Sequence, residues 1–381
     1  MSTFAHTLGD QLPETIARPQ TVSKPDTDLA NRIQVALENP LDYPPLTDAI
    51  FPGDLVAIAV HPDVPSGQQV IQHVIEYLLA KGVEPNDMTL VTARRMNFQM
   101  PAELAALETK LNFAVHDMDD EQSVSYLAAN QDGQPIKINR TLFDADVIIP
   151  ITCRDHPASF NEIYPEFSHA ETIQRYQQAA NHLKERRGEI RLANEHLGVF
   201  ISLNIVGGPG GEVREVLFGQ KEPCDLAAEE MASQIWSVEP QPPVPLVIAT
   251  MEDAPENQTW QQFCLALVAA NDVSDGDGQI VICSELADQP EDDIRQVLMM
   301  PFEVDEERVG DKLAKASELM QRVVRILMDR QVFLKSNLSE SVVEELGLGP
   351  IAGADEFRRL VARADRGILL RDAHKVKIRV D

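Results

Sequence analysis

The sequence has few cysteines, and none of them is paired in sequence. The four cysteines stand at positions 153, 224, 264 and 283, and no two are spaced as in a Cys-x-x-Cys motif. This spacing gives no support to a zinc-binding or a thioredoxin-like site. A few unpaired thiols are the usual content of a protein in a reducing compartment, so we expect the protein to be cytoplasmic.

Basic side chains and long apolar runs are also scarce. The chain has 33 lysines and arginines against 61 aspartates and glutamates, a formal net charge of −28. Nucleic acids and anionic membrane surfaces are bound by basic residues concentrated on one face, so we expect neither partner. No apolar run approaches the roughly 20 residues that span a bilayer. Residues 1–28 also lack the apolar segment of a secretory signal.

What is present is the composition of a soluble globular protein. Of the 381 residues, 44% are hydrophobic and 25% are charged, which suits more than one core-forming domain. We predict an N-terminal arm over residues 1–43, a first domain over 44–236 and a second domain over 246–381. The proline-rich stretch "SVEPQPPVP", residues 237–245, reads as a linker between the two domains.

Apolar runs of strand length alternate with segments of helical spacing. In the first domain we predict strands at 55–60, 88–92, 113–116 and 147–151, and helices at 70–81 and 102–111. In the second domain we predict strands at 246–250 and 279–284, helices at 259–270 and 309–328, and a turn at 275–278. Alternating strands and helices are typical of a parallel sheet covered on both faces. The predicted fold is therefore α/β, with two α/β domains and a cleft between them.

One segment of the first domain departs from this alternation. Apolar strands at 199–206 and 212–218 flank the glycine-rich run "GGPGG". A phosphate-binding glycine loop leads into a helix N-terminus, whereas this one leads into a strand. The segment therefore predicts a β-hairpin added to the mainly parallel sheet.

Four stretches of the first domain resemble those of a known family in order and spacing. They are "YPPLTDAIFPGDLVAIAV", "LAKGVEPNDMTLVTA", "VHDMDD" and "LFDADVIIPI". From about Pro44 to the C-terminus, the sequence resembles the nickel-pincer-dependent lactate racemases and their relatives, which racemise or epimerise 2-hydroxy acids. The resemblance implies an isomerase with a nickel-pincer nucleotide held covalently by a lysine.

The first two motifs of that family are altered here. The family's first strand ends in Asp-x-Thr-Arg-Pro-x-Pro. At the position of the motif's aspartate this sequence has His61, and at the position of its anion-holding arginine it has Val64. Asp63 stands between these two residues. The family's Gly-Thr-His-Arg turn, which carries one of two catalytic histidines, reads Arg94-Arg95-Met96-Asn97. Methionine cannot transfer a proton, so this acid–base group is absent.

The remaining motifs are altered too. His156 matches the histidine of the family's Pro-His pair. No lysine stands between Asp155 and Lys184, where the family has the lysine that carries the pincer group. In the family's Gln-x-x-Lys pair, the glutamine is kept as Gln262 and the lysine position is Leu265. The resemblance therefore implies the family fold with no metal ligands and no covalent cofactor.

Three hypotheses stay open from the sequence. In the first, the protein acts on or binds a small 2-hydroxy acid or a related anion without the pincer. His156 is then the acid–base residue, and the cleft is lined by His61, Asp63, Arg94, Arg95 and Gln262. In the second, it is a non-catalytic binding or scaffold protein. In the third, it is an intact nickel-dependent racemase. The sequence predicts neither the natural ligand nor the oligomeric state.

Overall fold

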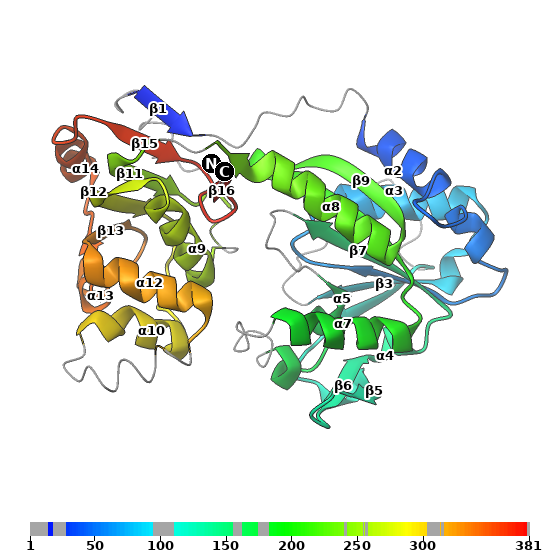
Figure 1. Cartoon of the computed structure of the whole chain (residues 1–381). Helices are drawn as coiled ribbons and strands as arrows, with labels where there is room; N and C mark the ends of the chain where they lie inside the picture. Colours follow the sequence, from blue (N-terminus) through cyan, green and yellow to red (C-terminus); the bar gives the residue numbers. More distant parts are fainter. Residues whose placement is uncertain are drawn as a thin grey trace. The chain divides into compact units, whose positions relative to one another are not determined.

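The computed structural model describes residues 14–17, 28–93, 110–154, 162–173, 183–239, 242–253, 255, 258–302, 313 and 316–378. The chain forms two compact units. The N-terminal unit is Ser23–Ser233, and the C-terminal unit combines Met1–Val22 with Gln234–Asp381. The division therefore falls after Ser233, and the C-terminal unit includes a strand from near the start of the chain (Figure 1).

The N-terminal unit is built on a six-stranded sheet in the order β4-β3-β2-β7-β8-β9. Neighbouring strands run parallel, except β8 and β9, which are antiparallel. This arrangement confirms the mainly parallel sheet and the hairpin. In sheet order, the strands are Asn112–His116, Met88–Ala93, Val56–Val60, Val147–Arg154, Ile201–Gly208 and Glu212–Gln220.

The central strand β2 shows why this sheet is covered on both faces. All five of its residues are buried. Val56, Ile58 and Val60 pack into one apolar cluster, and Ala57 and Ala59 pack into another. Side chains alternate between the faces of a strand, so a continuous apolar run requires a cover on each side.

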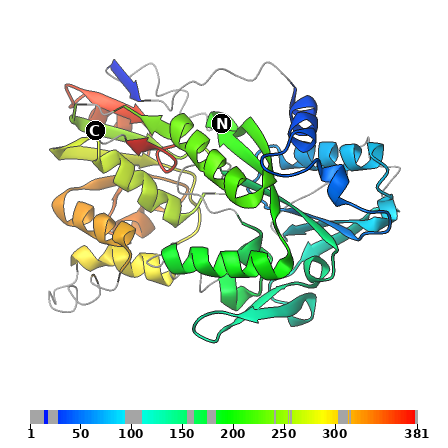
Figure 2. The same cartoon turned by 45° about the vertical axis from the view of Figure 1, so that its right-hand side comes forward.

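Helices α2 (Leu29–Glu38) and α3 (Gly67–Ala80) contribute to the first cluster. The buried positions of α3 include Val70, Ile71, Val74 and Ile75, which follow the predicted helical spacing. The opposite face is covered by α4 (Arg140–Phe143), α5 (Ile163–Glu166), α7 (Leu183–Leu197) and the hairpin β5 (Val124–Ala129) and β6 (Pro135–Asn139). Figure 2 shows α7 on the other side of the sheet from α2 and α3.

The C-terminal unit has a six-stranded, all-parallel sheet in the order β1-β15-β11-β12-β13-β14. In that order the strands are Glu14–Ala17, Gly367–Leu370, Val244–Thr250, Ser274–Cys283, Val332–Lys335 and Gly349–Pro350. On one face lie α9 (Trp260–Asn271), α10 (Asp292–Met299), α12 (Glu318–Asp329) and α13 (Glu340–Glu345). Helix α14 (Ala354–Val361) covers the other. Both units are α/β, as predicted.

Some predicted elements differ in the structure. The predicted turn at 275–278 is wrong, because β12 already begins at Ser274 and the register irregularity lies inside its pairing with β11. Within residues 237–245, Ser237–Val238 form strand β10, which pairs with β16 (Lys377–Ile378). The long helix α8 (Lys221–Trp236) was not predicted. Most of the predicted helix at 102–111 lies outside the described residues.

None of the helices in the described part of the chain is both long enough and apolar enough to cross a membrane.

Gly219 fixes the approach of the segment after α2 to strand β9. The Leu41 N–H donates to the Phe218 carbonyl and the Gln220 N–H donates to the Leu41 carbonyl, both at 2.8 Å. A Cβ atom on Gly219 would lie 2.2 Å from the Leu41 carbonyl oxygen, whereas one on Gly82 would meet no atom within 4 Å. Both glycines have positive φ.

We therefore expect Gly219→Ala to lower the free energy of unfolding more than Gly82→Ala. Gly82→Ala adds only the left-handed backbone cost of about 1–2 kcal/mol. Gly219→Ala adds a backbone overlap of about 1–3 kcal/mol on top of that. Urea denaturation of the two variants measures the difference, and equal losses would contradict the close approach of Leu41.

Candidate functional site

The carboxyl ends of the central strands of the N-terminal unit bring predicted residues together. His61 directly follows β2, and Cys153 and Arg154 end the neighbouring strand β7. The His61 N–H donates to the Ile151 carbonyl at 2.9 Å, which ties the end of β2 to β7. Ligands of open parallel sheets bind at this edge, so the residues that follow the strands are the first candidates for a site.

The His61 imidazole lies between two carboxylates and is only 4% exposed. Its Nδ1 is 3.8 Å from Asp63 Oδ2 and its Nε2 is 3.7 Å from Glu166 Oε2. The Asp63 N–H donates to Nδ1 at 3.3 Å, so the neutral ring carries its proton on Nε2, the nitrogen nearer Glu166. The structure thus brings the predicted His61 and Asp63 together and adds Glu166, which the sequence analysis missed.

Three of the predicted site residues lie outside the described part of the chain. They are Arg94, Arg95 and His156. Arg94 and Arg95 follow Ala93 in the chain, the last residue of β3, which pairs with β2. Their predicted roles, and that of His156, stay predictions.

Gln262 lies in the C-terminal unit, in the first turn of α9. Its Oε1 accepts a hydrogen bond from the Thr259 N–H at 2.9 Å, and its own N–H donates to Thr259 Oγ1 at 3.2 Å. This reciprocal pair is a capping box, which stabilises the start of a helix. The Gln262 Nε2 also donates to Asp253 Oδ2 at 3.3 Å. The side chain therefore has protein partners at both ends of its amide.

Arg154 belongs to a buried group of charges at the end of β7. Its Nη2 donates to Glu162 Oε1 at 3.2 Å, and Lys221 Nζ donates to Glu162 Oε2 and Asp225 Oδ2, each at 2.7 Å. Arg154 is 5% exposed and Glu162 is 4% exposed. Burial alone would raise the pKa of Glu162, but Lys221 and Arg154 outweigh it and lower this pKa to about 2. Glu162 is therefore ionised at neutral pH.

His116, at the end of β4, has a structural environment. Its Nε2 donates to the Ser168 carbonyl at 2.8 Å, and its Nδ1 accepts from Asn139 Nδ2 at 3.2 Å. Burial lowers the pKa of His116, which favours the neutral ring. With both nitrogens hydrogen-bonded inside the protein, His116 is not a candidate for proton transfer to a ligand.

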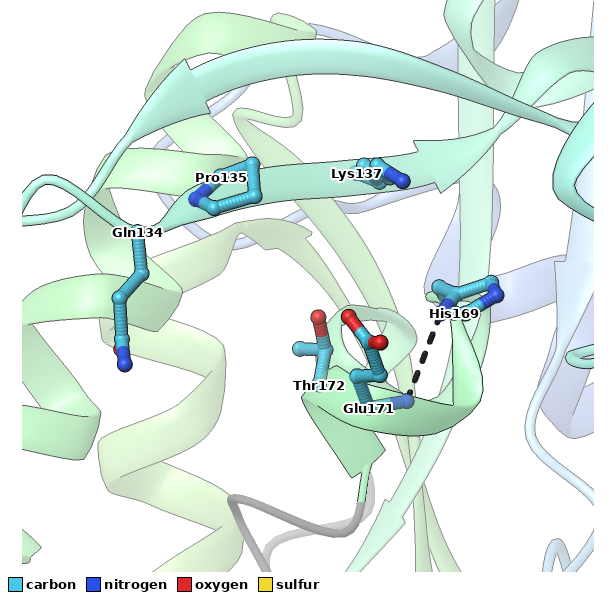
Figure 3. A pocket seen from close by; sticks show the side chains of 6 residues that line it. All are labelled: Gln134, Pro135, Lys137, His169, Glu171 and Thr172. Carbon is cyan, nitrogen blue, oxygen red and sulfur yellow. Dashed lines mark hydrogen bonds between the residues drawn. The ribbon is translucent and has the colours of Figure 1, made fainter.

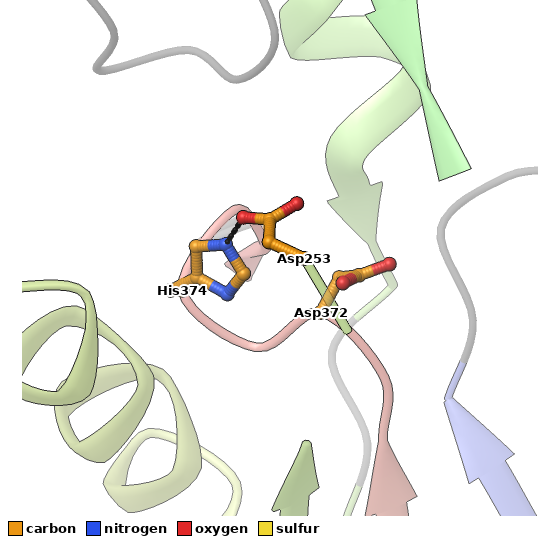
Figure 4. Close-up of side chains that lie close together, drawn as sticks. All are labelled: Asp253, Asp372 and His374. Atoms are coloured by element: carbon orange, nitrogen blue, oxygen red, sulfur yellow. Dashed lines mark hydrogen bonds and ion pairs between the residues drawn. The ribbon is translucent and has the colours of Figure 1, made fainter. Parts of the chain in front are cut away.

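A second charged cluster lies at the carboxyl ends of β11 and β15, in the C-terminal unit. It comprises Glu252, Asp253, Arg371, Asp372, His374 and Lys375. Asp253 accepts a hydrogen bond from His374 Nε2 at 2.8 Å (Figure 4). Its other carboxylate oxygen accepts one from Lys375 Nζ at 2.6 Å. Arg371 forms a bidentate ion pair with Glu252. Burial would raise the pKa of Asp253, but His374 and Lys375 outweigh it and hold this pKa well below its usual value.

Sequence reasoning missed this cluster because its members come from two distant segments. "TMED" begins with the last residue of β11, and "LLRDAHK" begins with the last two residues of β15. Asp253 and His374 are 121 residues apart. The signal available in the sequence was the pair of acidic residues, Glu252 and Asp253, shortly after the buried strand. Strand β15, which places the second segment beside the first, was not predicted.

A cavity of about 300 Å³ lies between the start of β6 and the residues after α5. It is lined by Gln134, Pro135, Lys137, His169, Glu171 and Thr172 (Figure 3). Lys137 lies 3.8 Å from Glu121. Of the predicted site residues that the structure describes, none lines this cavity, and its charges have both signs, so it does not favour a particular ligand.

Comparison with known proteins gives the following matches. Residues 2–158 match the family model described as the lactate racemase N-terminal domain. No curated protein matches the sequence. The fold is similar to that of the lactate racemase apoprotein from Thermoanaerobacterium thermosaccharolyticum, with a TM-score of 0.70 and 16% identity over 97% of this chain and 96% of that chain. It is also similar to a protein from Thermotoga maritima, with a TM-score of 0.62 and 14% identity over 94% of this chain and 100% of that chain.

The buried charge group at the end of β7 predicts a pH-dependent stability. Because the pKa of Glu162 is lowered on folding, its contribution is fully present above the unfolded pKa of about 4.3 and is lost as the pH falls towards 2. That contribution amounts to about 3 kcal/mol. Glu162→Gln mimics the protonated acid, so the unfolding free energies of the two proteins should differ most at pH 7 and converge near pH 2.

Denaturant titrations between pH 7 and pH 2 measure this difference in the free energy of unfolding. Glu38→Gln is the matched control, because Glu38 pairs with Lys81 on an exposed surface where ion pairs contribute little. If the unfolding free energies of the wild type and Glu162→Gln differed by the same amount at every pH, the ion-pair account would be contradicted.

Proposed function

Because residues 2–158 belong to the lactate racemase N-terminal domain family, we propose that the protein binds a small 2-hydroxy acid or a related anion without a covalently attached nickel pincer. The observation that carries the proposal is His61, held beside Asp63 and Glu166 where the central strands end. An imidazole at such an edge suits the handling of a proton near neutral pH.

The residues of this chain do not fit the pincer nucleotide. No lysine stands between Asp155 and Lys184 to form the covalent bond. Val64, at the position of the family's anion-holding arginine, is 6% exposed and packs in the apolar cluster with α3. An aliphatic side chain has no donor for a phosphate or a carboxylate. In this proposal no step passes through nickel.

An anion needs cations, and the described neighbours of His61 include two carboxylates. The proposal therefore assigns anion binding to Arg94 and Arg95, which follow β3 in the chain, and keeps His61 and Asp63 as further substrate-binding residues. His156 is the proposed acid–base residue. Gln262, in the C-terminal unit, keeps its predicted role in substrate binding, for which it would exchange its bond to Asp253 or Thr259 for one to the anion.

The burial of His61 favours a second candidate function, a non-catalytic binding or scaffold protein. A ring that is 4% exposed and accepts a bond from a neighbouring backbone N–H is also what a structural histidine looks like. In this case the family fold has been kept without its chemistry.

Binding of a hydroxy acid separates the first candidate from a scaffold protein that has no small-anion site. We expect D-lactate, L-lactate or malate to raise the melting temperature, because a ligand at 100 times its Kd stabilises the fold by about 2.7 kcal/mol. Arg95→Gln should weaken binding about tenfold or more, since a charge-assisted hydrogen bond contributes about 1.5–3 kcal/mol. Thermal shift and titration calorimetry give both values.

Arg191→Gln is the matched control. Arg191 is an exposed arginine paired with Glu195 on the surface of α7, and its loss should leave anion binding unchanged. If no hydroxy acid shifts the melting temperature of the wild-type protein, the binding proposal fails and the scaffold function stands. Equal weakening by Arg95→Gln and Arg191→Gln would point to non-specific attraction.

A further inference from the structure

Three hydrogen-bond donors of the C-terminal unit meet on the carboxylate of Asp253. His374 Nε2 donates to Asp253 Oδ2 at 2.8 Å (Figure 4). Gln262 Nε2 donates to the same oxygen at 3.3 Å, and Lys375 Nζ donates to Oδ1 at 2.6 Å. Both carboxylate oxygens are therefore bound, and one of the bonds comes from an ammonium group. Charge-assisted bonds of this kind are also the ones by which proteins recognise the carboxylate of a ligand.

These donors are held in place by contacts that do not involve Asp253. Gln262 Oε1 accepts a hydrogen bond from the Thr259 N–H at 2.9 Å, in the capping box of α9. The turn that carries the other two donors is fixed to the end of β11 by the Ala373 N–H, which donates to the Thr250 carbonyl at 2.9 Å. We therefore expect the donors to keep their positions if another carboxylate takes the place of Asp253. Donors that are already in place bind a ligand without a further ordering cost.

Asp253 is more exposed to solvent than the two donors that follow β15. Its side chain is 23% exposed, against 10% for Lys375 and 0% for His374. A carboxylate from solvent therefore reaches these donors from the side on which Asp253 lies. It is not simply added, because the charged cluster already holds three carboxylates against two permanent cations, and a fourth negative charge is repelled. Binding therefore requires that the new carboxylate replaces that of Asp253.

We propose that Gln262, His374 and Lys375 form a carboxylate-binding subsite of the C-terminal unit, which Asp253 occupies until the carboxylate of a small hydroxy acid replaces it. The inference rests on the proposed function and deepens it, since it names the cation that binds the acid in this unit and the internal group that competes with the acid. Lys375 contributes the charge, Gln262 and His374 contribute the second oxygen's bonds, and Asp253 is an autoinhibitory contact.

The competition sets the affinity of the site. Asp253 is part of the same chain, so its carboxylate is present at a high effective concentration beside the donors. Burial would raise the pKa of Asp253, but the bonds from His374 and Lys375 hold this pKa well below its usual value, so the competitor is ionised at neutral pH. The apparent affinity for the acid is lowered by the small fraction of molecules in which Asp253 has left the donors. Removing Asp253 should therefore tighten binding.

Calorimetric titration of the full-length protein with D-lactate, L-lactate and malate tests the subsite. Asp253→Ala should tighten binding of the acid about tenfold or more, because the internal competitor is gone. Lys375→Met should weaken binding about tenfold or more, because a charge-assisted hydrogen bond is lost. Asp253→Asn also removes the competing charge while keeping the side chain's shape, so it decides the outcome if Asp253→Ala does not fold. Circular dichroism shows whether each variant is folded.

Two controls isolate the carboxylate exchange. Asp272→Ala removes an acid of the same unit that pairs with Arg322, away from the subsite, and should leave the affinity unchanged. Lactamide, the neutral amide of lactate, should gain no affinity in Asp253→Ala, because it has no carboxylate to take the vacated place.

The outcomes separate this inference from the proposed function. If Arg95→Gln weakens binding of the acid but neither Asp253 variant tightens it, or Lys375→Met binds as the wild type does, the subsite is wrong and the proposed function stands. If neither the wild type nor a folded Asp253 variant binds any of the three acids, both are wrong. Tighter binding in the Asp253 variants together with weaker binding in Lys375→Met supports the exchange.

Discussion

The buried ion pair between Arg154 and Glu162 is the constraint on which the N-terminal unit depends most. Arg154 is the last residue of β7, and Glu162 directly precedes α5, so the pair fixes both ends of the intervening segment. Lys221 carries the same network to the first turn of α8. Breaking one partner of a buried pair leaves an uncompensated charge and costs about 3–5 kcal/mol. The segment between Arg154 and Glu162 is also where the predicted acid–base residue His156 lies.

Both units place their polar side chains at the carboxyl ends of parallel strands, but with different charges. In the N-terminal unit, His61 lies near Asp63 and Glu166. In the C-terminal unit, Asp253 accepts bonds from His374, Lys375 and Gln262. The first arrangement places an imidazole between two carboxylates, and the second surrounds a carboxylate with hydrogen-bond donors. Of these residues, the resemblance to the racemases pointed to His61, Asp63 and Gln262 only.

Much of the fold could be predicted from local patterns, whereas much of the site could not. The apolar run of β2 and the 3–4 spacing of α3 are local signals, and so is the glycine-rich turn between β8 and β9. Glu166 near His61 and His374 beside Asp253 depend on strand order and on turns, which no short window of sequence contains. Gln262 was predicted by motif, but its capping role depends on Thr259 and its second bond on Asp253.

The chain has a lactate racemase-like fold, and our central proposal is that it carries no covalent pincer, because no lysine stands between Asp155 and Lys184. The most direct measurement is the intact mass and nickel content of the protein after co-expression with enzymes that make the pincer nucleotide. The account predicts the mass of the unmodified chain and no stoichiometric nickel. A mass increase equal to the pincer group, localised to any lysine and accompanied by one nickel per chain, would contradict it.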